Sequence, residues 1–526
     1  MIVPLTPLDY KRRAVRDFGD KIGVVDGDRR FTYREFGDRA DRLAGALRAL
    51  GLGPGDRVAF ISYNTHHLLE AYYGVLQARG VLTPINIRLS SDDIAYVLEH
   101  SGATVLLYHR DFQEIVDGIR PRLRALRHCI IVEGQDPEAH QYEALLGRAT
   151  PDPGPDIFQV DENAVCELFY TSGTTGRPKG VALTHRSLAL HALYFNLTMR
   201  MSDADRVLHV VPLFHVNGWG TPQALTAVGG THVMLRKVVA QDILRLIERE
   251  RITILLGVPT IYNMLINEPT IGTFDLTSLR QAVSGGAPAA PSLIRAMEDK
   301  LGCLCVVGYG LTETSPLLSK ALPKAHLGGA PDDDLRRRST TGFEIVGVDM
   351  RVVDAEGREV PADEATVGEI IARSNVVMDG YYRDPEATAA VIRDGWFHTG
   401  DMAVVDAEGY VTIVDRKKDI IISGGENISS VEIEKVLAAH PAVYECTVLA
   451  VPDERWGETP KALVVLKPGR SGTAEEILTY CRRHLAGFKV PSSVEFRETL
   501  PKTGSGKIMK HVLREPYWQG YEKRVH

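Results

Sequence analysis

The sequence lacks the features that mark membrane, secreted and nucleic-acid-binding proteins. It has no run of about 18 apolar residues, as a membrane-spanning helix needs, and no apolar signal-peptide stretch at its start. Its 61 basic and 68 acidic side chains leave a net charge of −7, so no basic surface for nucleic acid is expected. Its six cysteines show neither disulfide-dense nor zinc-finger spacing. We therefore expect a cytoplasmic protein without stable membrane insertion.

A chain of 526 residues exceeds what one hydrophobic core usually serves, so at least two domains are expected. Strand-like runs, such as residues 57–62 and 81–85, alternate with helical patterns, such as residues 32–51, which predicts largely parallel sheets. Residues 340–415 contain short strands separated by turn residues, which favours a small antiparallel barrel or meander. The predicted fold is α/β: a large N-terminal domain of two α/β sheets and a small β-barrel, followed by a small, mobile α+β domain.

The stretch from Tyr170 to Gly180, YTSGTTGRPKG, has the composition of a phosphate-binding loop. Glycines let the backbone turn sharply and approach a ligand, and successive N–H groups form a concave anion-binding site. Hydroxyl groups add donors and can ligate a hard cation, while a lysine adds positive charge. The string does not fit the P-loop pattern G-x-x-x-x-G-K-[ST]. The predicted triphosphate-binding residues are Thr171, Ser172, Gly173, Thr174, Thr175, Gly176 and Lys179, with Thr174 also a candidate Mg²⁺ ligand.

This string resembles the phosphate-binding signature of the adenylate-forming superfamily, which includes acyl-CoA synthetases, luciferases and nonribosomal peptide adenylation domains. The resemblance implies that ATP activates a carboxylic acid as an acyl-adenylate, which then passes to a thiol such as coenzyme A. The motifs described next follow the family's order and cover the chain from roughly residue 10 to residue 515.

Two further motifs follow strand-like runs. GYGLTET, residues 308–314, follows CLCVV, and ligands of open α/β sheets bind at the carboxyl ends of strands. Tyr309 offers a ring face for an adenine, and the carboxylate of Glu313 can ligate Mg²⁺. The resemblance places SGGAP, residues 284–288, in the adenine pocket. The nucleotide-binding candidates from these motifs are Gly286, Ala287, Pro288, Gly308, Tyr309, Gly310 and Thr312.

A carboxylate that accepts hydrogen bonds from both ribose hydroxyls distinguishes a nucleotide from free phosphate. The resemblance assigns this role to Asp401, the last residue of GWFHTGD, and makes Arg416 a further ribose or phosphate contact. It also makes Asp415 the hinge between two domains, residues 1–415 and 416–526, and hinges are a few loop positions that absorb a backbone change. The predicted coenzyme A contacts are Ser423, Gly424 and Gly425.

Lys507 lies in PKTGSGK, which resembles the family's catalytic-lysine loop. Without the resemblance, a lysine between glycines near a chain end indicates a flexible basic tail. In the implied reaction a carboxylate attacks the α-phosphorus of ATP, so two anions must approach each other. Preorganised cations stabilise the charge that develops there. The resemblance therefore makes Lys507 the cation of the adenylation step.

The stretch PLFHVNGWGTP, residues 212–222, bears on the acid that is activated. Relatives that activate amino acids carry an Asp shortly after the Phe of this motif, and no carboxylate follows Phe214 here. FHVNGWG is similar to the FHVNAWG of medium- and long-chain fatty acyl-CoA synthetases, whose Trp gates the acyl tunnel. The predicted acyl-pocket residues are His215, Val216, Asn217, Gly218 and Trp219, and the predicted catalytic residues are Lys507, Glu313 and His215.

The acid and the acceptor remain open at this level. Ile422 and Asn427 stand where many relatives carry Lys and Trp, which weakens the fatty-acid assignment relative to an aryl or short functionalised acid. A carrier-protein phosphopantetheine is an alternative acceptor, although the ordinary spacing from Asp401 to Lys507 favours free coenzyme A. Luciferase-like oxygenation ranks lower, as does a nucleotide-binding regulator without catalysis. We predict an enzyme that uses ATP, Mg²⁺ and coenzyme A, favours a medium- or long-chain fatty acid, and has a homodimer as one possible assembly.

Overall fold

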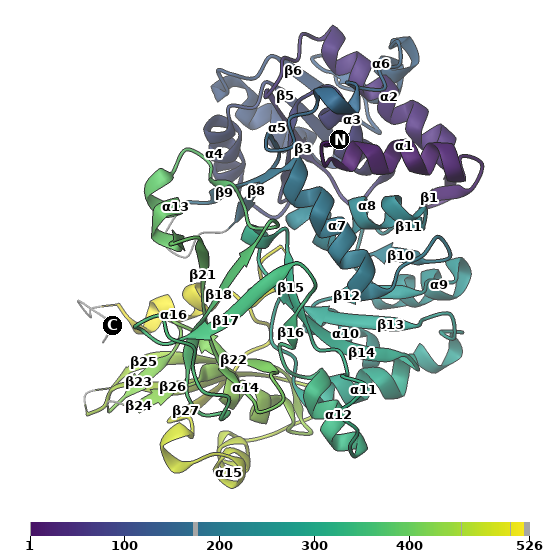
Figure 1. Ribbon diagram of the computed structural model, residues 1–526. Coiled ribbons are helices and arrows are strands. Elements are labelled where there is room, and N and C mark those ends of the chain that lie inside the picture. The colour runs from purple at the N-terminus through teal and green to yellow at the C-terminus, as the bar shows by residue number, and fades with distance from the viewer. Residues whose placement is uncertain (1, 172–176, 425, 454, 505, 520–526) are drawn as a thin grey trace.

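The described residues form four β-sheets, which Figure 1 shows from the N-terminal part at the top to the C-terminal part at the lower left. The computed structural model describes residues 2–171, 177–424, 426–453, 455–504 and 506–519. Three sheets come from residues up to Arg416, and a separate sheet comes from the residues after it. The predicted α/β fold, with a large N-terminal and a small C-terminal domain, is confirmed.

One large sheet carries the strand that leads into the predicted phosphate-binding loop. Its eight strands have the order β19-β9-β8-β4-β3-β5-β6-β7, and the six from β8 to β7 run parallel. β9 pairs antiparallel with β8, and β19 pairs antiparallel with β9. The strands are β3 (Arg57–Ile61), β4 (Val81–Ile85), β5 (Val105–His109), β6 (His128–Val132), β7 (His140–Gln141), β8 (Val165–Thr171), β9 (Lys179–Thr184) and β19 (Gly380–Tyr381).

The second large sheet has nine strands in the order β16-β15-β14-β13-β12-β10-β11-β1-β2. The six strands from β14 to β1 run parallel, and antiparallel strands complete both edges. The strands are β1 (Ile22–Asp26), β2 (Arg29–Thr32), β10 (Arg206–His209), β11 (Thr231–Met234), β12 (Ile254–Gly257), β13 (Gln281–Gly285), β14 (Leu304–Gly310), β15 (Leu317–Lys320) and β16 (Phe343–Glu344).

Helices connect the parallel strands and pack on the two large sheets (Figure 1). In the second helix, Thr32 Oγ1 accepts from the Glu35 N–H, and the Glu35 carboxylate accepts from the Thr32 N–H, so the two satisfy donors that a helix start leaves unpaired. The helices are α1 (Pro7–Phe18), α2 (Tyr33–Ala49), α3 (His66–Gln77), α4 (Ser91–Ser101), α5 (Gln113–Ile119), α6 (Tyr142–Arg148), α7 (His185–Met199), α8 (Val216–Val228), α9 (Ala240–Glu250), α10 (Pro259–Ile266), α11 (Pro291–Leu301) and α12 (Pro331–Arg338).

The segment predicted as a small barrel or meander is an antiparallel sheet. Its strands pair in the order β17-β18-β21, and β21 also pairs with β20 and β22. This is the order of a meander, with β19, a short helix and β20 between its second and third strands. The elements are β17 (Val348–Val353), β18 (Gly368–Ser374), α13 (Pro385–Val391), β20 (Ile392–Arg393), β21 (Trp396–Val405) and β22 (Val411–Arg416).

The C-terminal part is an α+β unit with its own sheet and its own apolar core. Strand order is β24-β23-β26-β25, and β27 adds to β26 in parallel. Figure 1 shows this unit beside the meander sheet and below the large sheets. The elements are β23 (Ile421–Ser423), β24 (Glu426–Ile428), α14 (Ser430–Ala438), β25 (Val443–Asp453), β26 (Gly457–Leu466), α15 (Ala474–His484), β27 (Ser493–Phe496) and α16 (Lys510–Arg514).

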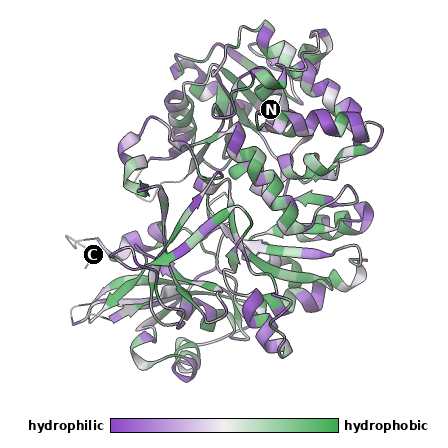
Figure 2. Ribbon diagram, in the orientation of Figure 1, coloured by the Kyte–Doolittle hydropathy of each residue, from purple (hydrophilic) through white to green (hydrophobic). Residues whose placement is uncertain are grey.

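Apolar residues concentrate in the strands, which are largely green in Figure 2, whereas the helices mix green with purple. Parallel strands that are buried on both faces read as continuous apolar runs, and β4 and β5 are buried along their whole lengths. Within the described residues, every helix is too short or too polar to span a bilayer.

Candidate active site

A cavity of about 1360 Å³ lies between the large N-terminal part and the C-terminal part. Its wall contains residues from strand ends of the large sheets, from the meander sheet, from α14 and from the loop before α16. It therefore collects side chains that are widely separated in the sequence. The predicted site residues on this wall are Thr171, Lys179, His215, Gly286, Ala287, Pro288, Gly308, Tyr309, Gly310, Thr312, Glu313, Asp401, Asp415, Arg416 and Lys507.

Parallel pairing of β13 with β14 brings two of the predicted motifs together. Gly285 lies opposite Gly308 in the register, so both motifs leave the sheet at the same edge. Gly286 has a φ of 76°, a backbone conformation that favours glycine. A Cβ on Gly310 would lie 1.8 Å from the carbonyl oxygen of Pro316, so only glycine fits there. These glycines allow the backbone, rather than side chains, to form this part of the wall.

Asp401, Tyr309 and Arg416 form one connected group. β21 and β22 pair Asp401 with Arg416, whose Nε lies 3.0 Å from Asp401 Oδ1. The Tyr309 hydroxyl donates to Asp401 Oδ2 over 2.7 Å. The carboxylate is thus oriented from both sides, and each of its oxygens still has acceptor capacity for a ligand hydroxyl.

Lys507 reaches this group from the C-terminal part of the chain. Burial, together with the positive charge of Arg416, lowers the pKa of Lys507 to about 8, while Asp401 and Glu313 act in the opposite direction. Burial, with a smaller contribution from Lys507, lowers the pKa of His215 to about 3. At neutral pH the cavity therefore contains a mostly protonated lysine beside a neutral imidazole.

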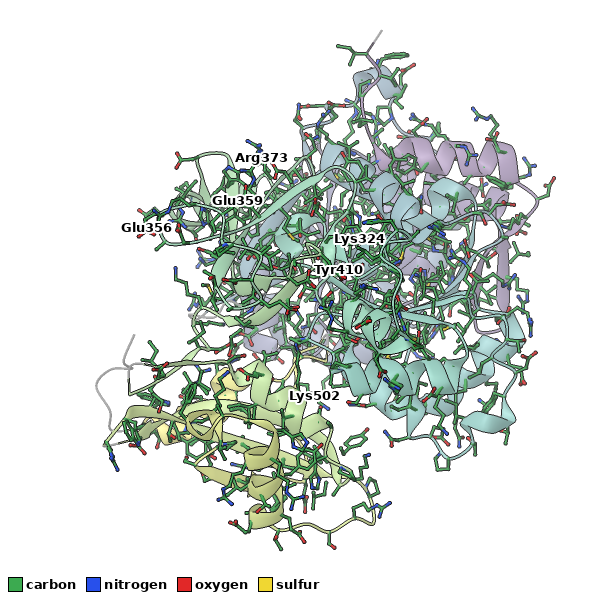
Figure 3. All side chains as sticks on the ribbon, turned by 60° about the horizontal axis from the view of Figure 1, so that its bottom comes forward. Lys324, Glu356, Glu359, Arg373, Tyr410 and Lys502 are labelled. Carbon is green, nitrogen blue, oxygen red and sulfur yellow. The ribbon has the colours of Figure 1, made fainter. Side chains whose placement is uncertain are left out.

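The loop that carries Lys507 is attached to the C-terminal sheet. Figure 3 labels Lys502 in this part of the molecule, and its Nζ lies 2.9 Å from Oε1 of Glu445 on β25. The Lys507 N–H donates to the Thr503 hydroxyl, and the Thr503 N–H donates to the Lys507 carbonyl. The position of the lysine thus depends on where the C-terminal part sits against the large part.

Tyr381 is a wall residue that the sequence analysis missed. Its hydroxyl donates to Glu313 Oε1 over 2.9 Å, and the Lys179 ammonium lies 5.0 Å from its ring centroid. Pairing of β19 with β9 sets it there, next to the strand that follows the phosphate-binding loop. The signal in the sequence was the pair of tyrosines after Gly380. Tyr381 links a predicted metal ligand to a predicted phosphate ligand.

Other predicted residues do not line this cavity. Val216, Asn217 and Gly218 are buried, and the Trp219 indole packs against the backbone at Gly285 and Gly286. Gly424 is exposed at the end of β23, where its backbone lies against Trp456, and Ser423 is partly buried nearby. Predicted residues outside the described part of the chain are Ser172, Gly173, Thr174, Thr175, Gly176 and Gly425.

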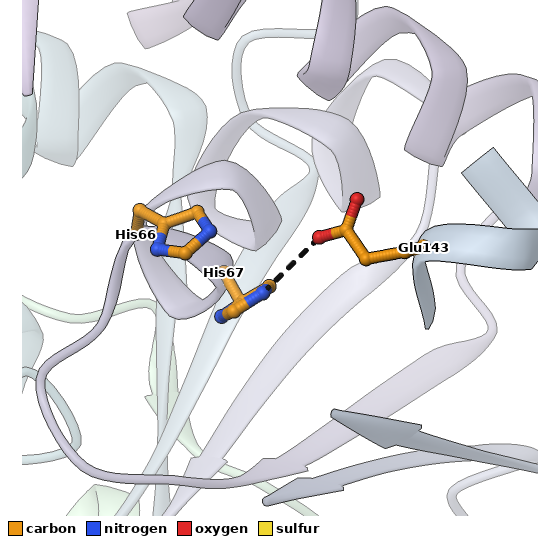
Figure 4. Close-up of side chains that lie close together, drawn as sticks. All are labelled: His66, His67 and Glu143. Carbon is orange, nitrogen blue, oxygen red and sulfur yellow. Dashed lines mark ion pairs between the residues drawn. The ribbon is translucent and has the colours of Figure 1, made fainter. Parts of the chain in front are cut away.

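Among the described wall residues, one offers a ligand that suits a magnesium ion. Mg²⁺ in phosphate sites is bound by one or two carboxylates together with phosphate oxygens, and Glu313 supplies one carboxylate. The one group of described residues with the spacing of a metal centre is elsewhere: His66, His67 and Glu143, shown in Figure 4. Both oxygens of Glu143 already accept hydrogen bonds from Arg39, at 2.7 and 2.9 Å. That cluster is therefore not the predicted magnesium site.

Two family models match the chain. Residues 11–382 match the model described as AMP-binding enzyme, and residues 432–507 match the AMP-binding enzyme C-terminal domain. The second match contains Lys507, and the first ends directly after the tyrosine that contacts Glu313.

Individual proteins match over almost the whole chain. A long-chain-fatty-acid–CoA ligase of Thermus thermophilus is 41% identical over 524 residues, which are 98% of this chain and 96% of the relative. The 4-hydroxybutyrate–CoA ligase 2 of Metallosphaera sedula is 38% identical, over 97% of this chain and 94% of the relative. Among solved structures, the anthranilate CoA ligase AuaEII in complex with anthranoyl-AMP has a TM-score of 0.90 and 27% identity, covering 98% of both chains.

Proposed function

The chain belongs to the AMP-binding enzyme family and is an acid–CoA ligase of the adenylate-forming superfamily; from this premise we propose that it activates a medium- or long-chain fatty acid. It uses ATP and coenzyme A. The observation that carries the proposed mechanism is the meeting of Lys507 with Asp401, Arg416 and Glu313 in one cavity.

In the first step, a carboxylate oxygen of the acid attacks the α-phosphorus of ATP and pyrophosphate leaves. Asp401 accepts the ribose hydroxyls, and Tyr309 presents its ring to the adenine. The Lys507 ammonium neutralises charge on the reacting phosphoryl group, which in comparable sites contributes about 2.7–4 kcal/mol per donor. Neutral His215 offers a hydrogen bond to the acyl carboxylate without adding charge.

The phosphates would be held by Lys179, by Thr171 and by the loop of residues 172–176, with Glu313 and Thr174 as the Mg²⁺ ligands. When bound, Mg²⁺ neutralises phosphate charge and orients the leaving pyrophosphate. Tyr381 donates a hydrogen bond to one oxygen of the Glu313 carboxylate, and its ring makes a cation–π contact with the Lys179 ammonium. It would therefore position both groups before a nucleotide binds.

In the second step, the thiolate of coenzyme A attacks the acyl carbonyl and AMP leaves. We place the hinge for this step at Asp415, between residues 1–415 and 416–526. Asp415 is the next-to-last residue of β22, the final strand of the meander sheet, and its Oδ2 accepts from the N–H of Ser430 at the start of α14 over 2.7 Å. Rotation there would withdraw Lys507 and bring forward the thioester-forming residues Ser423, Gly424 and Gly425.

The fatty-acid assignment rests on the acyl end of the cavity. Phe214 is followed by an imidazole held neutral, and no acidic side chain follows it in the motif to pair with a substrate ammonium. The first relative described above is named a long-chain-fatty-acid–CoA ligase. These features favour a carboxylate whose acyl group is apolar and carries no further charge.

A short or aryl acid is the second candidate. The indole of Trp219 lies against Gly285 and Gly286, beside the cavity, which would shorten the space for an acyl chain. Two similar proteins are named for 4-hydroxybutyrate and anthranilate. The deciding experiment is AMP formation with coenzyme A on a panel from acetate to stearate, plus benzoate, cinnamate and 4-hydroxybutyrate. Highest kcat/KM for octanoate or longer acids supports the first candidate, and highest kcat/KM for another acid supports the second.

The acceptor, location and assembly complete the proposal. Parallel reactions with coenzyme A and with a holo carrier protein test whether free coenzyme A is the acceptor. A cytoplasmic location stays a prediction, which cell fractionation tests, and a homodimer is tested by light scattering.

A further inference from the structure

The turn that carries Trp219 has an unusual backbone. Five consecutive residues, 216–220, have positive φ, from 36° at Val216 to 79° at Gly220. A left-handed backbone costs a non-glycine residue roughly 1–2 kcal/mol, and Val216, Asn217 and Trp219 are not glycine. Such strain persists only where surrounding contacts determine the conformation, and it concentrates at functional sites. The groups that hold this turn are therefore candidates for a functional role.

The backbone of the turn, residues 216–220, sets the position of the Trp219 indole against the cavity wall. A Cβ on Gly285 would lie 3.0 Å from Cη2 of Trp219, and one on Gly286 would lie 3.5 Å from its Cζ2. The same position on Gly286 is 3.3 Å from Cε of Lys507. A small rotation of the turn thus changes the space next to the catalytic lysine.

Glu167, in the middle of β8, binds the turn through two side chains. Its Oε2 accepts from Asn217 Nδ2 over 3.1 Å, and its Oε1 accepts from Gln223 Nε2 over 2.7 Å. Glu167 and Asn217 are fully buried, and Gln223 is 1% exposed. One carboxyl group therefore joins a residue inside the left-handed turn to the helix that follows it.

The carboxyl group is adapted to this buried position. Burial raises the pKa of Glu167 to about 8, so it is mostly neutral at pH 7 and avoids the cost of an unpaired buried charge. Two tyrosines of α3 hold the backbone on either side: Tyr72 donates to the Leu213 carbonyl and Tyr73 to the Pro222 carbonyl. The two tyrosines bind the backbone before and after the left-handed turn, whereas Glu167 binds a side chain within it.

We propose that Glu167 is a positioning residue for acyl selection: its carboxyl group, through Asn217 and Gln223, holds the left-handed turn that sets Trp219 against Gly285 and Gly286. This inference rests on the proposed acyl-CoA synthetase mechanism and assigns Glu167 a place in it. Glu167 does not touch the reacting atoms, and its effect passes through the indole.

The test compares Glu167→Leu with Glu167→Gln in the full-length enzyme. Leucine leaves two buried donors without an acceptor. Glutamine keeps the volume and the neutral state, and it can still bind both amides: its oxygen accepts from one, and its NH2 donates to the carbonyl oxygen of the other once that amide turns over, because Asn217 Oδ1 and Gln223 Oε1 are free to accept. Kinetics of pyrophosphate release would be measured with octanoate and palmitate. For Glu167→Leu the octanoate-to-palmitate ratio of kcat/KM should change by at least about fivefold, since unsatisfied buried donors are costly. The KM for ATP should stay within about twofold, because no nucleotide contact is altered.

Glu167→Gln should keep the wild-type octanoate-to-palmitate ratio of kcat/KM. If Glu167 only stabilised the fold, this ratio would not change in any folded variant. Glu70→Leu is the matched control, because Glu70 is equally buried but contacts Arg39 and Tyr142 instead of the turn. It should leave the ratio unchanged. Should Glu167→Leu fail to fold, Asn217→Ala removes the same contact from the other side and should shift the ratio alike.

The proposal is overturned if the folded Glu167→Leu or Asn217→Ala variant keeps the wild-type ratio, or if Glu70→Leu shifts the ratio equally. Failure of the proposed function looks different: the wild-type enzyme would then release no pyrophosphate with straight-chain acids. In that case the ratio is measured between the two acids that it activates best, and the same outcomes decide the role of Glu167.

Discussion

The large N-terminal part and the C-terminal part contribute to the cavity in different ways. The large part supplies a wall whose members are fixed by strand pairing: Gly285 opposite Gly308, and Asp401 opposite Arg416. The C-terminal part supplies Lys507 on a loop that its own sheet holds through Lys502. In the mechanism we propose, recognition of the nucleotide would therefore rest on sheet geometry, whereas the charge needed for the reaction would depend on how the two parts of the chain are placed.

Loss of Lys507 should have the largest effect and tests this division most directly. Lys507→Ala is expected to slow acyl-adenylate formation by about 10²–10³-fold, the usual effect of removing one preorganised donor. Thioester formation from supplied acyl-AMP should change by less than about threefold, because the lysine acts only in the first step. Separate assays of the two half-reactions measure this.

Lys502→Ala is the control for loop damage. It removes the ion pair with Glu445 but not the lysine in the cavity, so its effect on adenylation should be far smaller. Equal loss in both half-reactions of Lys507→Ala would contradict the assignment.

Substitution of Asp401 tests whether the wall of the large part binds the nucleotide. Asp401→Asn should raise the KM for ATP by about tenfold to a hundredfold, because hydrogen bonds to a charged group contribute about 1.5–3 kcal/mol. The kcat should fall less than in Lys507→Ala. Asp406→Asn is a matched control: Asp406 is also buried and pairs with an arginine, Arg336, at 2.9 Å, but it does not line the cavity. A similar rise in KM for both variants would mean that general stability, not nucleotide contact, is measured.

The pH dependence should show the smallest change and refines the role of the lysine. The pKa of Lys507 is lowered to about 8, so the free enzyme loses this positive charge as pH rises through that value. The kcat/KM for ATP should therefore fall above pH 8, by about tenfold per pH unit at most. Lys507→Arg keeps its charge at all these pH values, so its profile should stay flat there even if its rate is lower. A wild-type profile that is flat to pH 10 would contradict the assignment.

The sequence was sufficient for the features that local chemistry specifies. Alternating apolar and turn residues predicted the α/β sheets and the antiparallel segment at 340–415, and the structure confirms them. Motifs at strand ends, such as that around Tyr309, could be placed because parallel strands end at a common edge. Each of these predictions uses residues that lie close together in the chain.

Tertiary structure alone decided the contacts between distant segments. Tyr381 meets Glu313 and Lys179 because β19 pairs with β9, and no local pattern indicates that pairing. Likewise, nothing near Glu167 in the sequence reveals that it binds Asn217, or that the FHVNGWG turn is left-handed. Sequence periodicity reports which face of an element is buried; which partner covers that face is decided only when the sheets and both parts of the chain pack together.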